Sequence, residues 1–218
     1  MSDVETTPSQ ASFPNFPDSE LGTPTRKRPK PGERRVQILQ ALAEMLERPG
    51  AERITTAALA ASLEVSEAAL YRHFASKAQM FEGLIEFIEQ TVFSLVNQIT
   101  TREGVAGSQQ AGKVIAMVIQ FAEKNPGMTR VMVGDALVFE NERLQQRMNL
   151  FFDKLEATLK QSLRSVADGT DSLSPTVDTQ VQSAVLTAFL VGRLQRFARS
   201  GFKRLPSEHL EASLALIL

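Results

Sequence analysis

Residues 54–74 decide the fold class of this 218-residue chain, and they read ITTAALAASLEVSEAALYRHF. The sequence predicts two short helices here, at 57–63 and 67–74. Thr55 or Thr56 is expected to cap the first helix and Ser66 the second, because a hydroxyl at this position accepts a hydrogen bond from the first turn. The apolar residues of the segment predict a small core shared by the two helices: Leu59, Ala60, Leu63, Val65 and Leu70.

This spacing has two interpretations. A helix-turn-helix places its second helix in the major groove of DNA and presents that helix's first residues to the base edges. The small and polar residues on the outward face of 66–73 favour this interpretation. An ordinary pair of short antiparallel helices has the same spacing and needs no DNA.

Outward from this motif, the chain is predicted to be all-α from Glu33 onward. Apolar residues recur at helical spacing, and no stretch alternates with the period of two that a half-buried strand requires. In the helix expected at 33–48, the apolar stripe that faces the core is expected to include Val36. In the helix expected at 77–100, Met80 is expected to lie outside the core. Further helices are expected at 33–48, 77–100, 110–124, from 128–138 onward to about 166, 177–200 and 207–217.

Composition divides the chain into three parts. Residues 1–31 hold six of the ten prolines and too little apolar surface to offset the entropy of ordering, which predicts a disordered extension. Residues 32–78 form the expected DNA-binding domain, with a linking helix to about 100. Residues 79–218 form a larger helical domain.

Net charge is −1, but one short segment is strongly basic. Residues 1–25 carry four acidic and no basic groups, whereas residues 26–35 carry six basic groups and one acidic group. The motif segment 36–77 sums to −1, which is a weak electrostatic footprint for DNA. We therefore expect the basic residues to act as an auxiliary DNA arm, although a solubilising linker would have the same composition: Arg26, Lys27, Arg28, Lys30, Arg34 and Arg35.

The residues also disfavour several functions. The chain has no cysteine and two histidines, which leaves little for a metal site and excludes a thiolate nucleophile. No phosphate loop, dinucleotide fingerprint or catalytic triad is visible, so no enzyme activity and no cofactor are expected. The longest uncharged run, 179–192, is too short to span a membrane, and residues 1–25 lack the apolar region of a secretory signal. A cytoplasmic protein is expected.

The motif resembles the DNA-binding domain of TetR-family regulators. The matching residues are Ile54-Thr55-Thr56, Leu59-Ala60, Val65-Ser66, Leu70-Tyr71-Arg72-His73-Phe74 and Ser76-Lys77. This resemblance implies an all-α, TetR-like fold with a small three-helix helix-turn-helix domain and a larger helical dimerisation domain. One residue departs from the family: Glu64 stands where TetR proteins usually carry glycine, and glutamate in the left-handed turn costs about 1 kcal/mol.

By this resemblance, DNA contacts are expected from both short helices and from the start of the next. Thr55 and Thr56 are placed to meet a phosphate, and Ser66, Glu67, Ala68 and Ala69 lead the recognition helix. The alanines can meet thymine methyl groups, and Glu67 can accept a hydrogen bond from cytosine. Phosphate or base contacts are expected further along the chain from Tyr71, Arg72, His73 and Lys77.

Segments of the chain outside the motif resemble the nucleoid-occlusion factors, which are members of the TetR family. They include residues 84–89, the segment Asn125-Pro126-Gly127-x-Thr129-Arg130, and residues 136–145 and 196–203. The resemblance implies nucleoid association and binding of the division protein FtsZ between helix 77–100 and the helix that ends at Asn125. Phe87, Lys124 and Asn125 are the candidates, with lysine at 124 where those factors have arginine. Spacing alone leaves Phe87 either covered by a neighbouring helix or exposed for a partner.

Two further surfaces follow from helical spacing. Ala184, Ala188 and Gly192 recur every four residues and form a small-residue seam, which suits either packing within one chain or a close helix pair in a dimer. The resemblance favours a homodimer that reads palindromic double-stranded DNA. Helix 110–124 is expected to be core, although apolar residues there would also suit a ligand pocket. A ligand-responsive TetR repressor is therefore the alternative function.

Overall fold

The computed structural model describes residues 32–48, 54–101, 107–167 and 175–218. Within them the chain is helical, which confirms the all-α expectation. The elements are α1 (Glu33–Glu47), α2 (Thr56–Ser62), α3 (Glu67–Tyr71), α4 (Lys77–Thr100), α5 (Gly107–Lys124), α6 (Pro126–Met132), a 3-10 turn η1 (Asp135–Leu137), α7 (Glu142–Ala167), α8 (Pro175–Arg199) and α9 (Leu210–Ile217).

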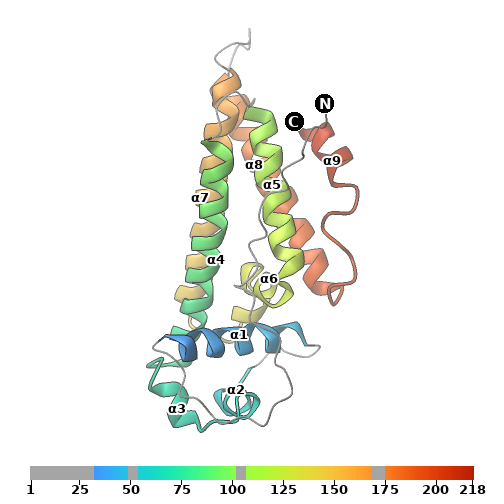
Figure 1. The fold of residues 1–218 in the computed structure, drawn as a ribbon. Coiled ribbons are helices and arrows are strands. Elements are labelled where there is room, and N and C mark those ends of the chain that lie inside the picture. The colour runs from blue at the N-terminus through green and yellow to red at the C-terminus, as the bar shows by residue number, and fades with distance from the viewer. Residues whose placement is uncertain (1–31, 49–53, 102–106, 168–174) are drawn as a thin grey trace, which may run out of the picture.

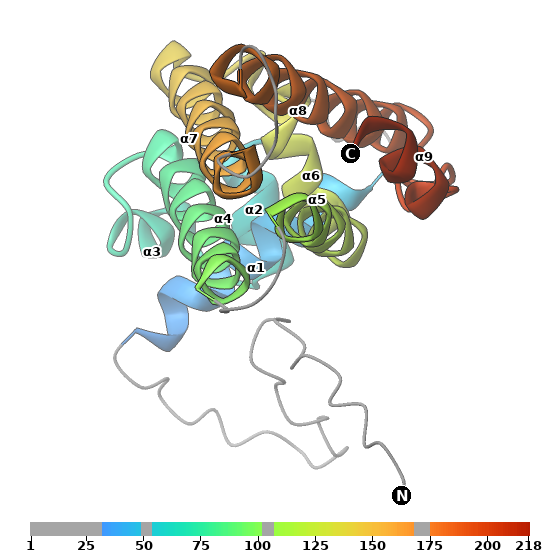
Figure 2. The ribbon, with the colours of Figure 1, turned by 90° about the horizontal axis from the view of Figure 1, so that it is seen from above.

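The helices form a small layer beneath a long bundle (Figure 1). Helix α1 runs across the lower end of the bundle, and α2 and α3 lie below it. Helices α4, α5, α7 and α8 form the bundle, α6 sits at its lower end, and α9 lies along one side (Figures 1 and 2). The chain therefore places α2 and α3 at one exposed end of the molecule.

One continuous core joins the layer to the bundle. It contains Ile38 and Leu42 from α1, Leu59 from α2 and Leu70 from α3, all of which are almost completely buried. Within the bundle the core is built from fully buried residues of four helices: Ile85, Ile88, Ile115, Val118, Leu155, Leu159, Leu186 and Leu190. Because burial is continuous, the position of α1 is tied to the position of the bundle.

Most helix boundaries agree with the sequence, and the differences have local causes. Helix α3 ends at Tyr71 rather than Phe74, because Arg72 caps its end and Arg72 and His73 form a turn. Helix α6 begins at Pro126, whose fixed φ suits a first helical position, and ends before Gly134, which has φ +85°. The single helix expected over 128–138 is therefore two elements, α6 and η1.

Two core assignments were wrong. Val36 was expected to face the core, yet 38% of its surface is exposed while Ile38 is fully buried. The buried stripe of α1 is therefore rotated from the expected one toward Ile38. Met80 was expected outside the core of α4, but it is fully buried because α1 crosses the start of this helix.

Candidate nucleic-acid interface and partner surface

Two hydroxyl caps fix the geometry of the helix-turn-helix. Thr55 Oγ1 accepts a hydrogen bond from the Ala58 amide at 3.2 Å, so Thr55 rather than Thr56 caps α2. Ser66 Oγ accepts from the Ala69 amide at 3.3 Å and caps α3. Each cap satisfies an amide that the first turn leaves without a helical partner. The residue at which each short helix begins is thereby fixed by the hydroxyl residue that precedes it.

Helix α3 presents one face to solvent and buries the other. Leu70 and Phe74 are buried in the core, whereas 45% of Tyr71 is exposed. The remaining exposed residues at this surface are all sequence candidates for DNA contact: Ser66, Glu67, Ala68, Arg72 and His73. Ala69 is half-buried. This end of the molecule therefore offers a short, protruding helix of the size that a major groove admits.

Polar side chains tie α2 to α3. Thr56 Oγ1 donates a hydrogen bond to Glu67 Oε2 at 2.5 Å, and the Tyr71 hydroxyl donates to Thr56 Oγ1 at 3.5 Å. These bonds hold three DNA candidates in one cluster at the exposed end. One oxygen of Glu67 is used by Thr56, which leaves its second oxygen as an acceptor for a base.

The turn between α2 and α3 has the left-handed geometry expected of the family. Glu64 has φ +53°, a conformation that a residue with a Cβ rarely adopts. The turn therefore keeps the geometry typical of the family, and Glu64 adopts a strained backbone conformation to fit it.

Lys77 lies at the first position of α4, but its ammonium group has a partner within the chain. It forms an ion pair with Glu140, whose side chain is 10% exposed. The Lys77 side chain remains 26% exposed and its ammonium has three donors, so it retains donors for a phosphate. The contact with Glu140, which follows η1, was not anticipated from sequence, because 63 residues separate the two.

The basic arm divides into two parts. Arg26, Lys27, Arg28 and Lys30 lie outside the described residues. Arg34 and Arg35 lie in α1, and Arg35 donates a hydrogen bond to the His73 carbonyl at 3.1 Å. Its guanidinium carbon stands 4.2 Å from the centre of the Phe74 ring. Arg35 thus packs against the end of the recognition segment instead of extending from the domain.

The candidates for partner binding are placed differently from one another. Lys124 is exposed at the end of α5. Asn125 is 9% exposed, and its amide donates to the Phe121 carbonyl at 2.7 Å, so this side chain closes the end of α5. Phe87 on α4 is half-buried and packs against the core, so its ring is partly covered by neighbouring residues and partly accessible.

Lys124 and Asn125 line a small hollow beside α1. Its volume is about 180 Å³. The other residues that line it come from α1 and α6, and sequence reasoning missed the contribution of α1: Gln40, Ala43, Glu44, Glu47 and Met128. Phe87 does not line this hollow. The periodicity of α1 carries no signal that this helix meets the residues at the end of α5.

Close contact between α1 and α6 brings these residues together. A Cβ built on Gly127 would lie 2.0 Å from the Ala43 carbonyl oxygen, so only glycine fits between the two backbones. Burial raises the pKa of Glu47 and the neighbouring Glu44 charge raises it further, while a hydrogen bond from the Gly127 amide opposes both. The DNA-binding layer is therefore in close backbone contact with α6, which directly follows the end of α5.

Ion pairs connect α4 to α7. Arg143 contacts Glu82 at 2.6 Å, and Arg147 Nε donates to Glu89 Oε1 at 3.0 Å. The hydrogen bond to Glu89 raises the pKa of Arg147. Together with Lys77–Glu140, these pairs align the linking helix with the bundle over several turns.

The small-residue seam lies on the surface of α8. Ala184 and Ala188 are exposed and Gly192 is half-buried. A Cβ built on Gly192 meets nothing within 4 Å. Val181 and Val185 beside the seam are 58% and 46% exposed. Packing within one chain therefore does not account for the small residues, in contrast to one of the two interpretations above.

The described residues contain no group of three or more potential metal ligands. Among the helices of the described part, none is long and apolar enough to cross a bilayer.

Two family models match the chain. Residues 38–84 match the model of bacterial regulatory proteins of the TetR family, and residues 109–218 match a SlmA-like model described as a tetracyclin repressor-like C-terminal domain. The nucleoid occlusion factor SlmA of Idiomarina loihiensis is 50% identical over 179 residues, which cover 82% of this chain and 90% of that protein. The chain belongs to the SlmA family of nucleoid occlusion factors. SlmA of Vibrio cholerae is 49% identical over 185 residues, which cover 84% of this chain and 93% of that one.

Solved structures confirm the TetR-like fold. The transcriptional regulator FadR of Bacillus subtilis, solved with stearoyl-CoA, has a TM-score of 0.65 at 15% identity and covers 84% of this chain and 96% of its own. The TetR-family regulator PfmR of Thermus thermophilus has a TM-score of 0.65 at 19% identity and covers 84% and 94%. At such identities the likeness concerns the fold alone, whereas the SlmA relatives define the family.

Proposed function

We propose that this chain is a dimeric nucleoid-occlusion factor that binds palindromic DNA through α3 and, at the same time, contacts FtsZ near the end of α5. Binding at chromosomal sites would disrupt FtsZ polymers over the nucleoid. The observation that carries the proposal is the exposed face of α3, capped by Ser66 and anchored by buried Leu70 and Phe74, in a chain half identical to SlmA proteins.

The proposed DNA contacts need no catalytic chemistry. The amides at the start of α2, together with Thr55, suit a phosphate, and the exposed Ala68 suits a thymine methyl group. Tyr71 and Arg72 lie further along the same exposed surface. A twofold dimer through the α8 seam would set two such surfaces about one DNA turn, roughly 34–36 Å, apart.

DNA binding is tested by fluorescence anisotropy with a palindrome selected from random DNA by the protein itself. Arg72→Ala is expected to weaken binding by tenfold or more. Arg164→Ala, at an exposed position near the far end of α7, serves as the control and should bind as the parent does. Equal binding by both variants would contradict the assignment of α3.

We propose that the basic residues before α1 supply the electrostatic attraction to DNA phosphates that segment 36–77, with its net charge of −1, lacks. Deletion of residues 1–32 should reduce the slope of log affinity against log salt, because each phosphate contact contributes about 0.9 to that slope. An unchanged slope would remove the arm from the binding mechanism.

Partner binding is tested by sedimentation of FtsZ polymers with the protein, with and without its DNA site. The parent should reduce pelleting most when DNA is present. Lys124→Ala should lose this effect, whereas Lys113→Ala, exposed on the same helix three turns earlier, should retain it. A protein without effect on FtsZ that leaves DNA upon addition of a hydrophobic ligand would instead support a ligand-responsive repressor.

A further inference from the structure

An ion pair joins the first residue of α4 to the larger helical domain. The ammonium group of Lys77 contacts the carboxylate of Glu140, which lies between η1 and α7. Lys77 belongs to the part of the chain that matches the TetR model, and Glu140 belongs to the part that matches the SlmA-like model. A residue of the larger domain thus contacts a candidate for DNA binding directly.

Glu140 is held in place by its own surroundings. Its amide donates a hydrogen bond to the Leu137 carbonyl at 3.0 Å, and Leu137 is buried in the core. In the first turn of α7, Arg143 pairs with Glu82 of α4 at 2.6 Å. The start of α7 is therefore fixed against α4, and the Glu140 carboxylate cannot follow the Lys77 ammonium toward a ligand.

The two side chains of the pair differ in exposure. The Glu140 side chain is 10% exposed, whereas the Lys77 side chain is 26% exposed. Solvent ions screen a charge at this depth much less than they screen a surface charge. Among the residues that the structure describes, Glu140 forms no other ion pair. Lys77 therefore reaches solvent with a fixed negative charge behind it.

This negative charge matters because the motif has few cations. Segment 36–77 carries four basic and five acidic groups, and Lys77 is one of the four. A phosphate that approaches Lys77 also meets the charge of Glu140, so two anions share one ammonium group. The attraction that Lys77 offers to DNA is therefore weaker than that of an unpaired lysine.

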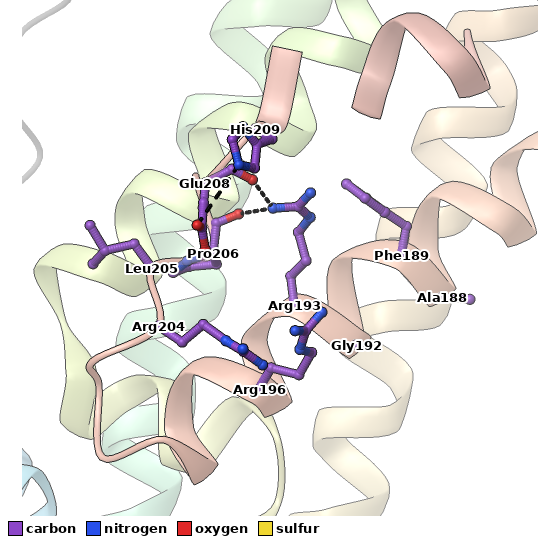
Figure 3. A pocket seen from close by; sticks show the side chains of 10 residues that line it. All are labelled: Ala188, Phe189, Gly192, Arg193, Arg196, Arg204, Leu205, Pro206, Glu208 and His209. Atoms are coloured by element: carbon purple, nitrogen blue, oxygen red, sulfur yellow. Dashed lines mark hydrogen bonds and ion pairs between the residues drawn. The ribbon is translucent and has the colours of Figure 1, made fainter. Parts of the chain in front are cut away.

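Glu140 is not part of the small-residue seam through which the dimer is proposed to form. Ala188 and Gly192 of the seam wall a hollow of about 520 Å³ on α8, beside the segment that leads to α9 (Figure 3). Neither Lys77 nor Glu140 lines this hollow. A substitution of Glu140 therefore removes no side chain of the seam, and its effect on DNA affinity is separable from loss of a seam contact.

We propose that Glu140 is a positioning residue that sets the affinity for DNA through Lys77. In the free protein its carboxylate holds the ammonium group at the start of α4. In the complex it competes with a DNA phosphate for the same ammonium group. A residue of the larger domain thereby limits how tightly the helix-turn-helix binds. This role rests on the proposed function, because it requires Lys77 to meet a phosphate.

Fluorescence anisotropy with the selected palindrome measures the affinity of the full chain at several salt concentrations. Glu140→Gln keeps the shape of the side chain and an acceptor for Lys77, but it removes the negative charge. This variant should bind DNA about threefold to tenfold more tightly than the parent, since a dimer contains two such pairs. The slope of log affinity against log salt should steepen by up to about 0.9 per subunit. Glu140→Asp keeps the charge and should bind more like the parent than like Glu140→Gln.

Glu142→Gln is the matched control. Glu142 is exposed at the first position of α7, two residues from Glu140, and it forms no ion pair with the described residues. Its substitution removes the same charge without affecting the partner of Lys77, so affinity and salt slope should stay close to those of the parent. Equal tightening by Glu142→Gln and Glu140→Gln would assign the effect to net charge and overturn the role of Glu140.

Lys77→Gln and the double variant K77Q/E140Q complete a double-mutant cycle. Lys77→Gln should weaken DNA binding, and the added Glu140→Gln should then have little effect, because Glu140 acts through Lys77. If Lys77→Gln weakens binding but Glu140→Gln does not tighten it, or tightens it equally without Lys77, the role of Glu140 is wrong while the DNA contact stands. If Lys77→Gln binds as the parent does, the phosphate contact itself is wrong, and the role of Glu140 is wrong with it. Far-ultraviolet circular dichroism checks that every variant is folded.

Discussion

At the scale of single residues, Glu64 is the clearest case of a strained backbone conformation that the fold keeps. The resemblance to the TetR family predicts a left-handed backbone conformation at this position, where the family usually has glycine. The structure has φ +53° there. A side chain that departs from the family pattern therefore did not change the turn. Surrounding contacts impose the geometry, since α2 and α3 share a buried core through Leu59 and Leu70.

Replacement of Glu64 by glycine should raise the free energy of unfolding by about 1 kcal/mol, because the left-handed strain is removed. Urea denaturation monitored by circular dichroism measures this change. Glu64→Asn should recover part of the gain, since asparagine tolerates this conformation. Glu64→Gln keeps the strain, so a gain equal to that of glycine would assign the effect to charge instead.

Contacts between distant residues were the hardest to foresee. Lys77 was correctly expected at the start of α4, but its ion pair with Glu140 joins residues far apart in sequence. Arg35 was expected in a basic arm, and the structure places it on the His73 carbonyl and the Phe74 ring. Charge composition identifies basic residues but not the carbonyls and rings that they meet.

At the scale of elements, local signals predicted the helices well. Thr55 and Ser66 cap α2 and α3 at the expected places, and α6 begins at Pro126, two residues before the expected start. Rotation of a helix about its axis was less predictable, as Val36 and Ile38 show. On a helix with apolar residues at several neighbouring angles, the partner decides which of them is buried, and periodicity does not identify the partner.

The junction of α1 and α6 should be intolerant of even one added carbon. Gly127→Ala places a methyl group 2.0 Å from a backbone oxygen of α1, which cannot turn aside as a side chain can. We expect a loss of about 3 kcal/mol in the free energy of unfolding. Gly112→Ala is the control, because its Cβ meets only the ends of two flexible side chains, Leu218 at 3.3 Å and Leu214 at 4.0 Å. Similar losses in both variants would contradict the explanation.

The same junction should make stability depend on pH through Glu47. Its pKa is raised in the folded protein, so the ionised form is disfavoured there relative to the unfolded chain. The resulting contribution to stability is intact below the unfolded pKa and is lost as pH rises through the folded pKa. Glu47→Gln should therefore be more stable than the parent at pH 7.5, but this gain should vanish at pH 4.

Urea denaturation at both pH values measures the effect of Glu47. Glu211→Gln, exposed on α9, controls for the loss of one surface charge. A gain for Glu47→Gln that is the same at pH 4 and pH 7.5 would show that ionisation is not its cause.

At the scale of the whole molecule, the exposed seam on α8 is the feature that an isolated subunit leaves unexplained. Ala188 lies at its centre, with exposed Val185 beside it. If the seam pairs two subunits, Ala188→Glu would bury a charge at a close helix contact. We expect the variant to sediment as a monomer at concentrations where the parent is a dimer.

Ala212→Glu, at an exposed position on α9, is the control for the seam and should sediment as the parent does. A dimeric Ala188→Glu variant would place the interface elsewhere. Weaker DNA binding by the monomeric variant is also expected, because the two half-sites would no longer be held by one assembly.

The backbone contact between Gly127 and Ala43 has a mechanical consequence. At Gly127 the backbones of α1 and α6 pack too closely for a side chain to stand between them, so the two helices form one packed unit between α3 and the end of α5. A tilt of α3 as it settles into a groove would therefore turn Lys124 with it. Under the function proposed above, a rotation of this unit on DNA binding would reorient the partner surface without any change in its internal structure.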